Sequence, residues 1–264
     1  LLVGNKDNKV NGILICLDST EQIIDEAIEK GCNLVIAHHP IVFSGLKKFT
    51  ASNYIEKTII KAIKNDINIY AFHTNLDNLI NGVNSKLANL LELQNIRILK
   101  PKENQLVKIS VFVPINNADN IRNAMFNAGA GNIGNYSNCS FNNEGQGSFM
   151  ANKDSKPYVG VAEKLHFEKE VKIEVIVPVH LKNIVIKQMI ESHPYEEVAY
   201  DIYSLENIHS KIGAGIIGEL DNEISSKNFL LQIKERLNIS SIRHTKLCKD
   251  NIKTVALCGG SGSF

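Results

Sequence analysis

Short apolar strands alternate with amphipathic helices along the first part of the chain, and this pattern constrains the fold more than any other feature. Runs that read as buried strands cover residues 12–17, 34–37 and 67–72, and helical patterns cover 19–31, 54–66 and 82–93. The alternation returns near the end, with a helix over 228–238 and a strand over 252–258. Strands that alternate with helices pair in parallel through right-handed crossovers. We therefore expect a doubly wound α/β domain.

The first predicted helix carries recognisable end signals. Ser19 and Gln22 have the spacing of a capping box, and Gly31 stands where a helix would stop. Between them, Ile23, Ile24, Ala27 and Ile28 form an apolar stripe at helical spacing. The segment Asp18-Ser19-Thr20 is accordingly interpreted as a helix N-cap.

The middle of the chain contains an internal repeat. The octamers VKISVFVP and VKIEVIVP begin at Val107 and Val171, and each ends in a proline that closes a strand. Each is followed by a helical stretch and then by a second strand-like run, over 134–141 and 196–205. Two such β-α-β units commonly pair as an antiparallel ferredoxin-like sandwich. We expect a ferredoxin-like domain, residues 105–206, inserted into an α/β domain with pieces 1–104 and 207–264.

Polar or glycine-rich residues follow every strand of the predicted α/β domain. They are Asp18-Ser19-Thr20, His38-His39, the run from His73 to Asp77, and the glycine-rich run at 259–263. Ligands of parallel sheets bind beyond the carboxyl ends of the strands, so these segments are expected to converge. Imidazole and carboxylate together suit a borderline divalent ion. The pattern predicts a metal site.

Two adjacent histidines, His38 and His39, stand where the second strand ends. Side chains of neighbouring strand residues point to opposite faces, and Pro40 restricts His39 to extended conformations. The pair can share one ion only if the backbone bends, so it favours two neighbouring ions. Plainer interpretations are a surface loop or a satisfied polar contact. His73 could likewise simply hydrogen-bond the backbone.

Four further motifs need interpretation. GAGNIG (129–134) and GAGIIG (213–218) match a dinucleotide-binding pattern, but neither follows a strand and opens a helix. CGGSGS could cradle phosphate or form a tight turn. SHPYEEVAYD (192–201) is interpreted as a structural turn, with an interdomain or subunit contact as the functional alternative.

Composition excludes several classes of protein. Hydrophobic residues make up 44% of the chain, and 29 basic against 28 acidic residues leave a net charge of +1. This balance fits a globular protein and gives no electrostatic case for nucleic acid or an anionic membrane. No apolar run is long enough to cross a membrane, and we expect no signal peptide. Five cysteines without a CxxC motif indicate reduced thiols in a cytoplasmic protein.

Six motifs together resemble the NIF-three-like dinuclear metal centre proteins, the family of the GTP cyclohydrolase I type 2 homologues. They are, in order, LLVG, LDST, IAHHPIVF, HTNLD, SHPYEEVAYD and CGGSGSF. The inserted region resembles the PII/CutA-like domain of longer bacterial members. The resemblance spans nearly the whole chain, and both ends look cut when they are compared with that family.

The resemblance implies a centre of two divalent ions, which could be zinc, iron or manganese. His38 would bind one ion, and His39 with Asp77 the other. The remaining ligands are expected after Phe264, so the site within this chain would be incomplete. His73, Asn75 and Ser261 are weaker candidates for orienting a ligand or contacting substrate. The resemblance also implies a cytoplasmic homohexamer.

Two functions of different class remain open. The first is a metal-dependent hydrolase that resembles GTP cyclohydrolase and acts on a small molecule such as a nucleotide. The alternative is a metal-binding regulatory or scaffold protein that forms a hexameric ring without that activity. The sequence names neither the metal nor the substrate, because family membership transfers a site more safely than a reaction.

Overall fold

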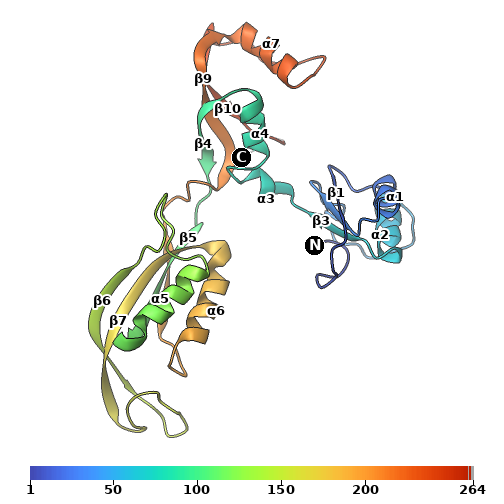
Figure 1. The fold of residues 1–264 in the computed structure, drawn as a ribbon. Coiled ribbons are helices and arrows are strands. Elements are labelled where there is room, and N and C mark those ends of the chain that lie inside the picture. The colour runs from blue at the N-terminus through green and yellow to red at the C-terminus, as the bar shows by residue number, and fades with distance from the viewer. Residues whose placement is uncertain (261, 263–264) are drawn as a thin grey trace. The chain divides into compact units, whose positions relative to one another are not determined.

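The chain divides into two compact units in the computed structural model, which describes residues 1–260 and 262 (Figure 1). One unit contains Leu1–Ile96 and Gly218–Phe264, and the other is Arg97–Ile217. The chain passes from the first unit to the second within β4 (Gln94–Pro101) and returns within β9 (Gly213–Ser225). The second unit contains all of the predicted insert, residues 105–206, and extends beyond it on both sides.

Three parallel strands form the first sheet, as the alternating pattern predicts. They are β1 (Ile13–Cys16), β2 (Leu34–Ala37) and β3 (Asn68–Ala71), in the order β1-β2-β3. The register sets Cys16 beside Ala37, and Ala37 beside Ala71. The three strands therefore end level with one another, and the residues that follow them meet at one edge of the sheet.

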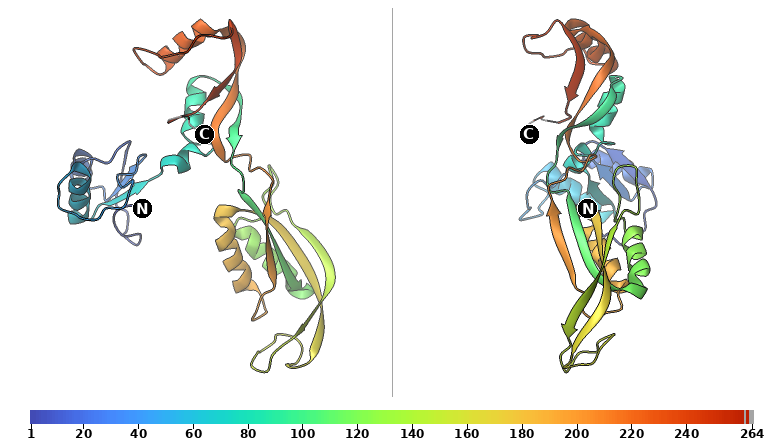
Figure 2. Two further views of the ribbon diagram at one scale, coloured as in Figure 1. Left: turned by 180° about the vertical axis from the view of Figure 1, so that it is seen from behind. Right: turned by 90° about the vertical axis from the view of Figure 1, so that its left-hand side faces the viewer.

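Helices α1 (Glu21–Glu29) and α2 (Tyr54–Lys64) lie side by side on one face of this sheet (Figures 1 and 2). Their apolar stripes pack on alternate strand residues and form a core that includes Ile24, Ala27, Val35, Ile59, Ala62 and Ile69. On β1 the alternate residues point the other way, and Ile15 is 78% exposed. The described residues thus cover one face of β1 and leave the other open.

The first helix begins one residue later than the sequence analysis predicts. Thr20, not Ser19, is its N-cap, and the Thr20 hydroxyl accepts a hydrogen bond from the Ile23 N–H. The capping-box spacing of Ser19 and Gln22 therefore indicated the wrong N-cap residue, because the hydroxyl oxygen of the adjacent Thr20 makes the capping hydrogen bond instead. This leaves Asp18 free for a different role.

The remainder of the first unit is built differently from the prediction. A short helix α3 (His73–Asp77) and helix α4 (Val83–Leu90) follow β3, and α7 (Ser226–Arg236) precedes β10 (Asn251–Leu257). We expected β10 to end at the same edge as the first three strands. Instead it belongs to a second sheet, in the order β10-β9-β4. The prediction was wrong because the partners of β10 are set by pairing between segments far apart in the sequence, which local apolar runs do not reveal.

The second unit is an antiparallel sheet with two helices on one face (Figure 2). The sheet order is β6-β7-β5-β8, with β5 (Leu106–Pro114), β6 (Phe141–Met150), β7 (Leu165–Pro178) and β8 (Tyr200–Leu205). Helices α5 (Ala118–Asn127) and α6 (Lys182–Ser192) follow β5 and β7 after the 3₁₀ turns Ile115–Asn117 and Val179–Leu181. This order is that of a ferredoxin-like fold, which confirms the prediction.

The repeated octamers pair with each other at the centre of that sheet. Val107 lies opposite Val177, and Val113 lies opposite Val171, in antiparallel register. Their inward side chains form a core with residues of both helices, including Ile109, Ile121, Met125, Ile173, Val185 and Met189. The two halves of the unit therefore bury the same positions of the repeat against each other.

The second strand of the first repeat lies later than predicted. Residues 134–140 form no extended strand, although Ile133 and Tyr136 make an isolated bridge, and β6 begins at Phe141. The prediction failed because β6 (FNNEGQGSFM) is largely exposed and polar, so it lacks the alternation that marks a half-buried strand.

Other features of the sequence have simple places in the structure. None of the helices in the described part of the chain is long and apolar enough to cross a membrane. All five cysteines are free thiols, and Cys248 is exposed. The GAGNIG run follows α5, whereas GAGIIG lies inside β9.

Candidate metal centre

Three histidines gather at the edge where β2 and β3 end. The backbone pairing of the two strands continues past Ala37, because the His73 N–H donates to the His38 carbonyl oxygen at 2.9 Å. The ring centroids are 4.9 Å apart for His38 and His39, 5.7 Å for His38 and His73, and 5.9 Å for His39 and His73. Parallel pairing thus brings imidazoles from two separate strands into one cluster.

The adjacent histidines do not point apart as the strand pattern predicted. Both residues lie in a bend beyond the last residue of β2. Their N–H groups still donate to the ends of β1, at the carbonyl oxygens of Cys16 and Leu17. Because the backbone bends at this point, strict alternation of side chains is lost and the two rings lie next to each other. Opposed directions therefore cannot serve as the argument for two ions.

Asp77 reaches the same cluster from α3. This helix has five residues, so His73 and Asp77 stand at its two ends with i,i+4 spacing and share a face. Oδ1 of Asp77 lies 3.8 Å from Nε2 of His38, and both side chains are 22% exposed. The run that follows β3 therefore forms one helical turn, and this turn carries the carboxylate to the histidines.

The helix begins with an unusual backbone conformation at His73. Its φ of 34° lies in the left-handed region, which residues with a side chain seldom occupy. Such conformations cost about 1–3 kcal/mol and cluster at functional sites. The ring of Phe43 packs edge-on against the His73 ring, with centroids 5.9 Å apart.

The carboxylate of Asp18 accepts a hydrogen bond from the Nδ1 side of the His39 ring. The Nδ1–H of His39 donates to Oδ1 of Asp18 at 2.8 Å, and both groups are about half exposed. A carboxylate only accepts hydrogen bonds, so this contact places the proton on Nδ1 and leaves Nε2 as the free nitrogen. From the sequence, Asp18 was expected at this edge of the sheet but was interpreted as part of a helix cap and not as a partner of His39. Its position directly after β1, level with His39, was the available signal.

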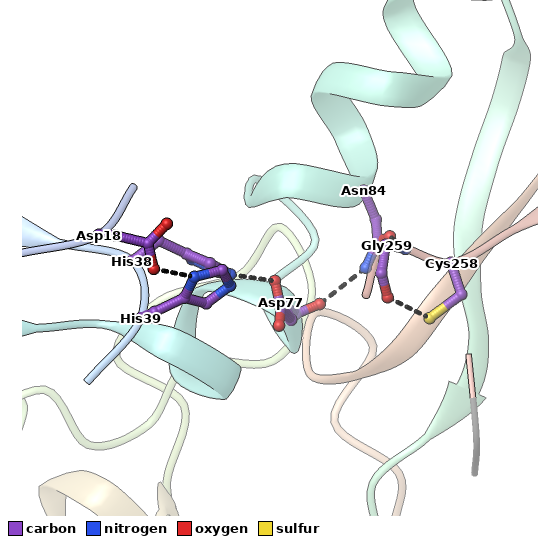
Figure 3. A network of polar contacts seen from close by, with 7 residues as sticks. All are labelled: Asp18, His38, His39, Asp77, Asn84, Cys258 and Gly259. Carbon is purple, nitrogen blue, oxygen red and sulfur yellow. Dashed lines mark hydrogen bonds and ion pairs between the residues drawn. The ribbon is translucent and has the colours of Figure 1, made fainter. Parts of the chain in front are cut away.

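Asn84 connects Asp77 to the loop after β10 (Figure 3). Its side-chain nitrogen donates to the Asp77 carbonyl oxygen at 2.9 Å, and its side-chain oxygen accepts from the Gly259 N–H at 2.6 Å. Asn84 is buried on α4. Sequence analysis missed this residue, because a buried asparagine within a helix carries no pattern of its own.

Asn75 and Ser261 were weaker candidates for contacting a ligand or substrate. Asn75 is exposed on α3, and no side-chain contact ties it to the histidine cluster in the described part of the chain. Ser261 lies outside the described residues. Among the described residues of the glycine-rich run, Gly259 is linked to the site through Asn84.

The donor set fits a divalent ion in chemistry, although it is incomplete. Imidazole nitrogen and carboxylate oxygen are ligands of borderline metals. Within residues 1–260 and 262, no group of three or more His, Cys, Asp or Glu side chains is arranged to hold one ion. A closed structural zinc site takes four protein ligands, whereas a catalytic site keeps positions open. His38, His39 and Asp77 therefore supply suitable ligand atoms but do not by themselves complete a site of either kind.

Comparison with known proteins identifies the family. The model of Duf34/NIF3 (NGG1p interacting factor 3) matches residues 1–264, the whole chain. The chain belongs to the Duf34/NIF3 family. This Duf34/NIF3 chain is 41% identical over 264 residues to the "GTP cyclohydrolase 1 type 2 homolog" of Bacillus subtilis. It is 42% identical over 264 residues to the protein of that name from Halalkalibacterium halodurans. All of the chain and 71% of each relative are covered.

A solved structure of the Duf34/NIF3 family has the same arrangement. It is the crystal structure of a Bacillus cereus protein related to NIF3, with 42% identity and a TM-score of 0.81. The match covers 98% of this chain and 69% of that one. The family resemblance seen in the motifs is thus confirmed. The ligand assignment that it implied for this Duf34/NIF3 chain remains a prediction.

Proposed function

We propose that the chain binds divalent metal ions in a dinuclear centre through His38, His39 and Asp77, and that it is a metal-dependent hydrolase. The observation that supports this most is the convergence of these three side chains: His38 and His39 follow the end of β2, and Asp77 lies in the helical turn α3. Bound ions would supply Lewis acidity, which polarises a substrate oxygen and lowers the pKa of water.

The chain's own residues prepare the centre in defined ways. Asp18 fixes the orientation of the His39 ring, so that Nε2 is available as a ligand atom. Asn84 holds the backbone of Asp77 and so restricts where the carboxylate can go. Three ligands are few for two ions, so water or further ligands must complete both coordination shells.

His73 is the residue proposed to move protons near the reacting group. Its ring lies within the histidine cluster but is not one of the proposed ligands. Histidine is the side chain whose ordinary pKa suits proton transfer near neutral pH. In the proposed reaction, a water oxygen bonds to a ring carbon, one carbon–nitrogen bond breaks, and the released nitrogen takes the proton.

GTP is the substrate proposed for this reaction, at the carbon of its imidazole ring. The support is the name of the relatives, which are GTP cyclohydrolase 1 type 2 homologues. The backbone N–H groups of the glycine-rich loop after β10 are candidates for contacting the phosphates.

Metal binding and turnover are tested separately. Isothermal titration with Zn²⁺, Mn²⁺ and Fe²⁺ is performed on the protein and on His38→Ala, His39→Ala and Asp77→Ala. Each variant should bind metal at least about tenfold more weakly. The matched control is His244→Ala, because His244 is exposed and its Nδ1 bonds only the neighbouring Thr245 carbonyl oxygen. Equal losses in the control would reject the site.

Turnover of GTP is then followed with each metal-loaded protein. The expected result is formation of a ring-opened product that depends on His38 and His39. If metal binds as proposed but GTP is unchanged with all three metals, the GTP reaction is rejected while the metal centre stands. If His39→Ala alters assembly without any catalytic change, the scaffold function replaces the hydrolase.

A further inference from the structure

A cavity of about 450 Å³ lies within the second unit, and none of the clustered histidines lines it. It lies against the face of the sheet that the two helices leave open. The core residues Val111 and Val171 point toward α5 and α6, so the neighbouring Phe112 and Glu170 point to the opposite face. The β6–β7 hairpin and the segment after α6 supply the other walls. The volume is typical of a site for a small organic molecule.

Three aromatic rings and a buried carboxylate define the chemistry of the cavity. Phe149, Tyr158 and Tyr195 line it, and the ring centroids of the first two each lie 6.1 Å from that of Tyr195. Glu170 is only 9% exposed, and its Oε1 accepts a hydrogen bond from the Tyr195 hydroxyl at 2.9 Å. Burial, together with this bond, raises the pKa of Tyr195, which keeps the phenol protonated as a donor.

A glycine makes room for the carboxylate. At Gly147 on β6, a Cβ atom would lie 2.1 Å from Oε2 of Glu170. A side chain there would require the carboxylate to move, so the glycine at residue 147 leaves room for Glu170 in its observed position. The second oxygen of the carboxylate is thereby left beside backbone in the cavity wall.

The charge of the walls has one sign. Glu196 and Glu197 join Glu170 in lining the cavity, and the described lining residues include no lysine, arginine or histidine. Lys108 and Lys172, on the same face of the sheet, pair with Glu174 instead. A buried carboxylate without a cation is costly, and a positively charged ligand would remove that cost.

His193 fixes the segment that carries Tyr195. Its Nε2–H donates to the Phe112 carbonyl oxygen, and its Nδ1 accepts from the Tyr195 N–H, both at 3.1 Å. Burial lowers the pKa of His193, which matches the neutral tautomer that these two bonds require. The SHPYEEVAYD motif is thus a turn whose histidine positions a cavity wall.

We propose that this cavity binds a small organic cation, an ammonium or guanidinium group attached to an apolar or aromatic body. The carboxylate of Glu170 would accept hydrogen bonds from the cationic group, and the aromatic faces would attract its charge. The apolar body would fill the space beside Phe149 and Tyr158. Neither the metal ligands nor the proposed hydrolase reaction involves these residues.

The test uses three probes of similar shape and different charge: 2-phenylethylamine, which is a cation at neutral pH, 2-phenylethanol and phenylacetate. Binding to the full chain is measured by titration calorimetry. The amine should bind at least about tenfold more tightly than the alcohol, and the acid more weakly still. Equal binding of amine and alcohol, or no binding of the amine, would overturn the proposal.

Variants locate the site. Glu170→Gln should weaken amine binding at least about tenfold and leave alcohol binding unchanged. Glu144→Gln is the matched control, because Glu144 is an exposed carboxylate on the same hairpin that does not line the cavity. Should Glu170→Gln fail to fold, Tyr158→Ala replaces it, since Tyr158 is 56% exposed. That variant should also bind the amine more weakly, and unchanged binding would contradict the proposal.

Discussion

Oδ1 of Asp18 lies 2.8 Å from Nδ1 of His39, across the ends of two neighbouring parallel strands. The contact forms because β1 and β2 end level with each other, so the residue after one strand can reach a residue after the next. The contact fixes Nδ1 of the His39 ring and leaves its Nε2 free. A carboxylate that holds a histidine in this way is typical of a metal ligand with a supporting outer contact.

Asp18→Ala should weaken metal binding by about 10- to 100-fold, because the His39 ring would lose its fixed tautomer and orientation. Stability should change little, since both side chains are about half exposed. Titration calorimetry with Zn²⁺ measures the effect. Asp25→Ala is the control: Asp25 also makes an exposed ion pair, with Lys61, but away from the cluster. Metal affinity that falls equally in both variants would contradict the role of Asp18.

Asn84→Ala should lower the free energy of unfolding by about 1–3 kcal/mol, because the Asp77 carbonyl oxygen and the Gly259 N–H would both lose their partner. Urea denaturation measures the change. The matched control is Asn89→Ala, an exposed asparagine on the same helix, which should change stability by less than about 0.5 kcal/mol. If the two variants are equally stable, the network of Asn84 contributes nothing.

Glu56 should make the first unit sensitive to acid. Its carboxylate accepts hydrogen bonds from the backbone and hydroxyl groups of Thr50 and Ser52 and from the side chain of Asn53. The backbone bonds, with the hydroxyl bonds, lower the pKa of Glu56 from 4.5 to about 2. Because the folded pKa is depressed, this contribution is complete above pH 4.5 and is lost as the pH falls toward 2.

Glu56→Gln should therefore lower the Tm at neutral pH, and its difference from the unsubstituted protein should shrink as the pH falls below 4.5. Thermal unfolding followed by circular dichroism at a series of pH values tests this. Glu29→Gln, an exposed carboxylate on α1, should show no such convergence. A difference in Tm that stays constant down to pH 2 would contradict the assignment.

The fold could be predicted for segments whose buried apolar residues recur at the spacing of a strand or a helix. The parallel strands β1 to β3 and the repeated octamers around Val107 and Val171 follow from apolar runs that are buried on at least one face. By contrast, β6 is mostly exposed and was placed too early, and the pairing of β10 with β9 had no local signal. Pairing between distant strands depends on tertiary contacts, which local patterns do not encode.

The candidate site could likewise be predicted only in part from the sequence. Strand-end logic placed His38, His39 and His73 at one edge, because parallel register is implied by the alternation of elements. It also placed Asp18 among the strand-end segments but did not foresee its contact with His39, and it gave no role to Asn84, because both roles depend on side-chain contacts across elements. The bend at His38 and His39 was also beyond a pattern that assumes a regular strand. The hexamer and the metal identity remain predictions.

The number of metal ions bound per chain tests the central claim most directly. The protein is saturated with Zn²⁺, freed of excess metal by gel filtration, and analysed by inductively coupled plasma mass spectrometry. We predict two ions per chain, and fewer than one in the double variant His38→Ala/His39→Ala, with His244→Ala unchanged. A protein that retains no zinc, or a double variant that retains as much as the unsubstituted chain, would contradict the dinuclear centre.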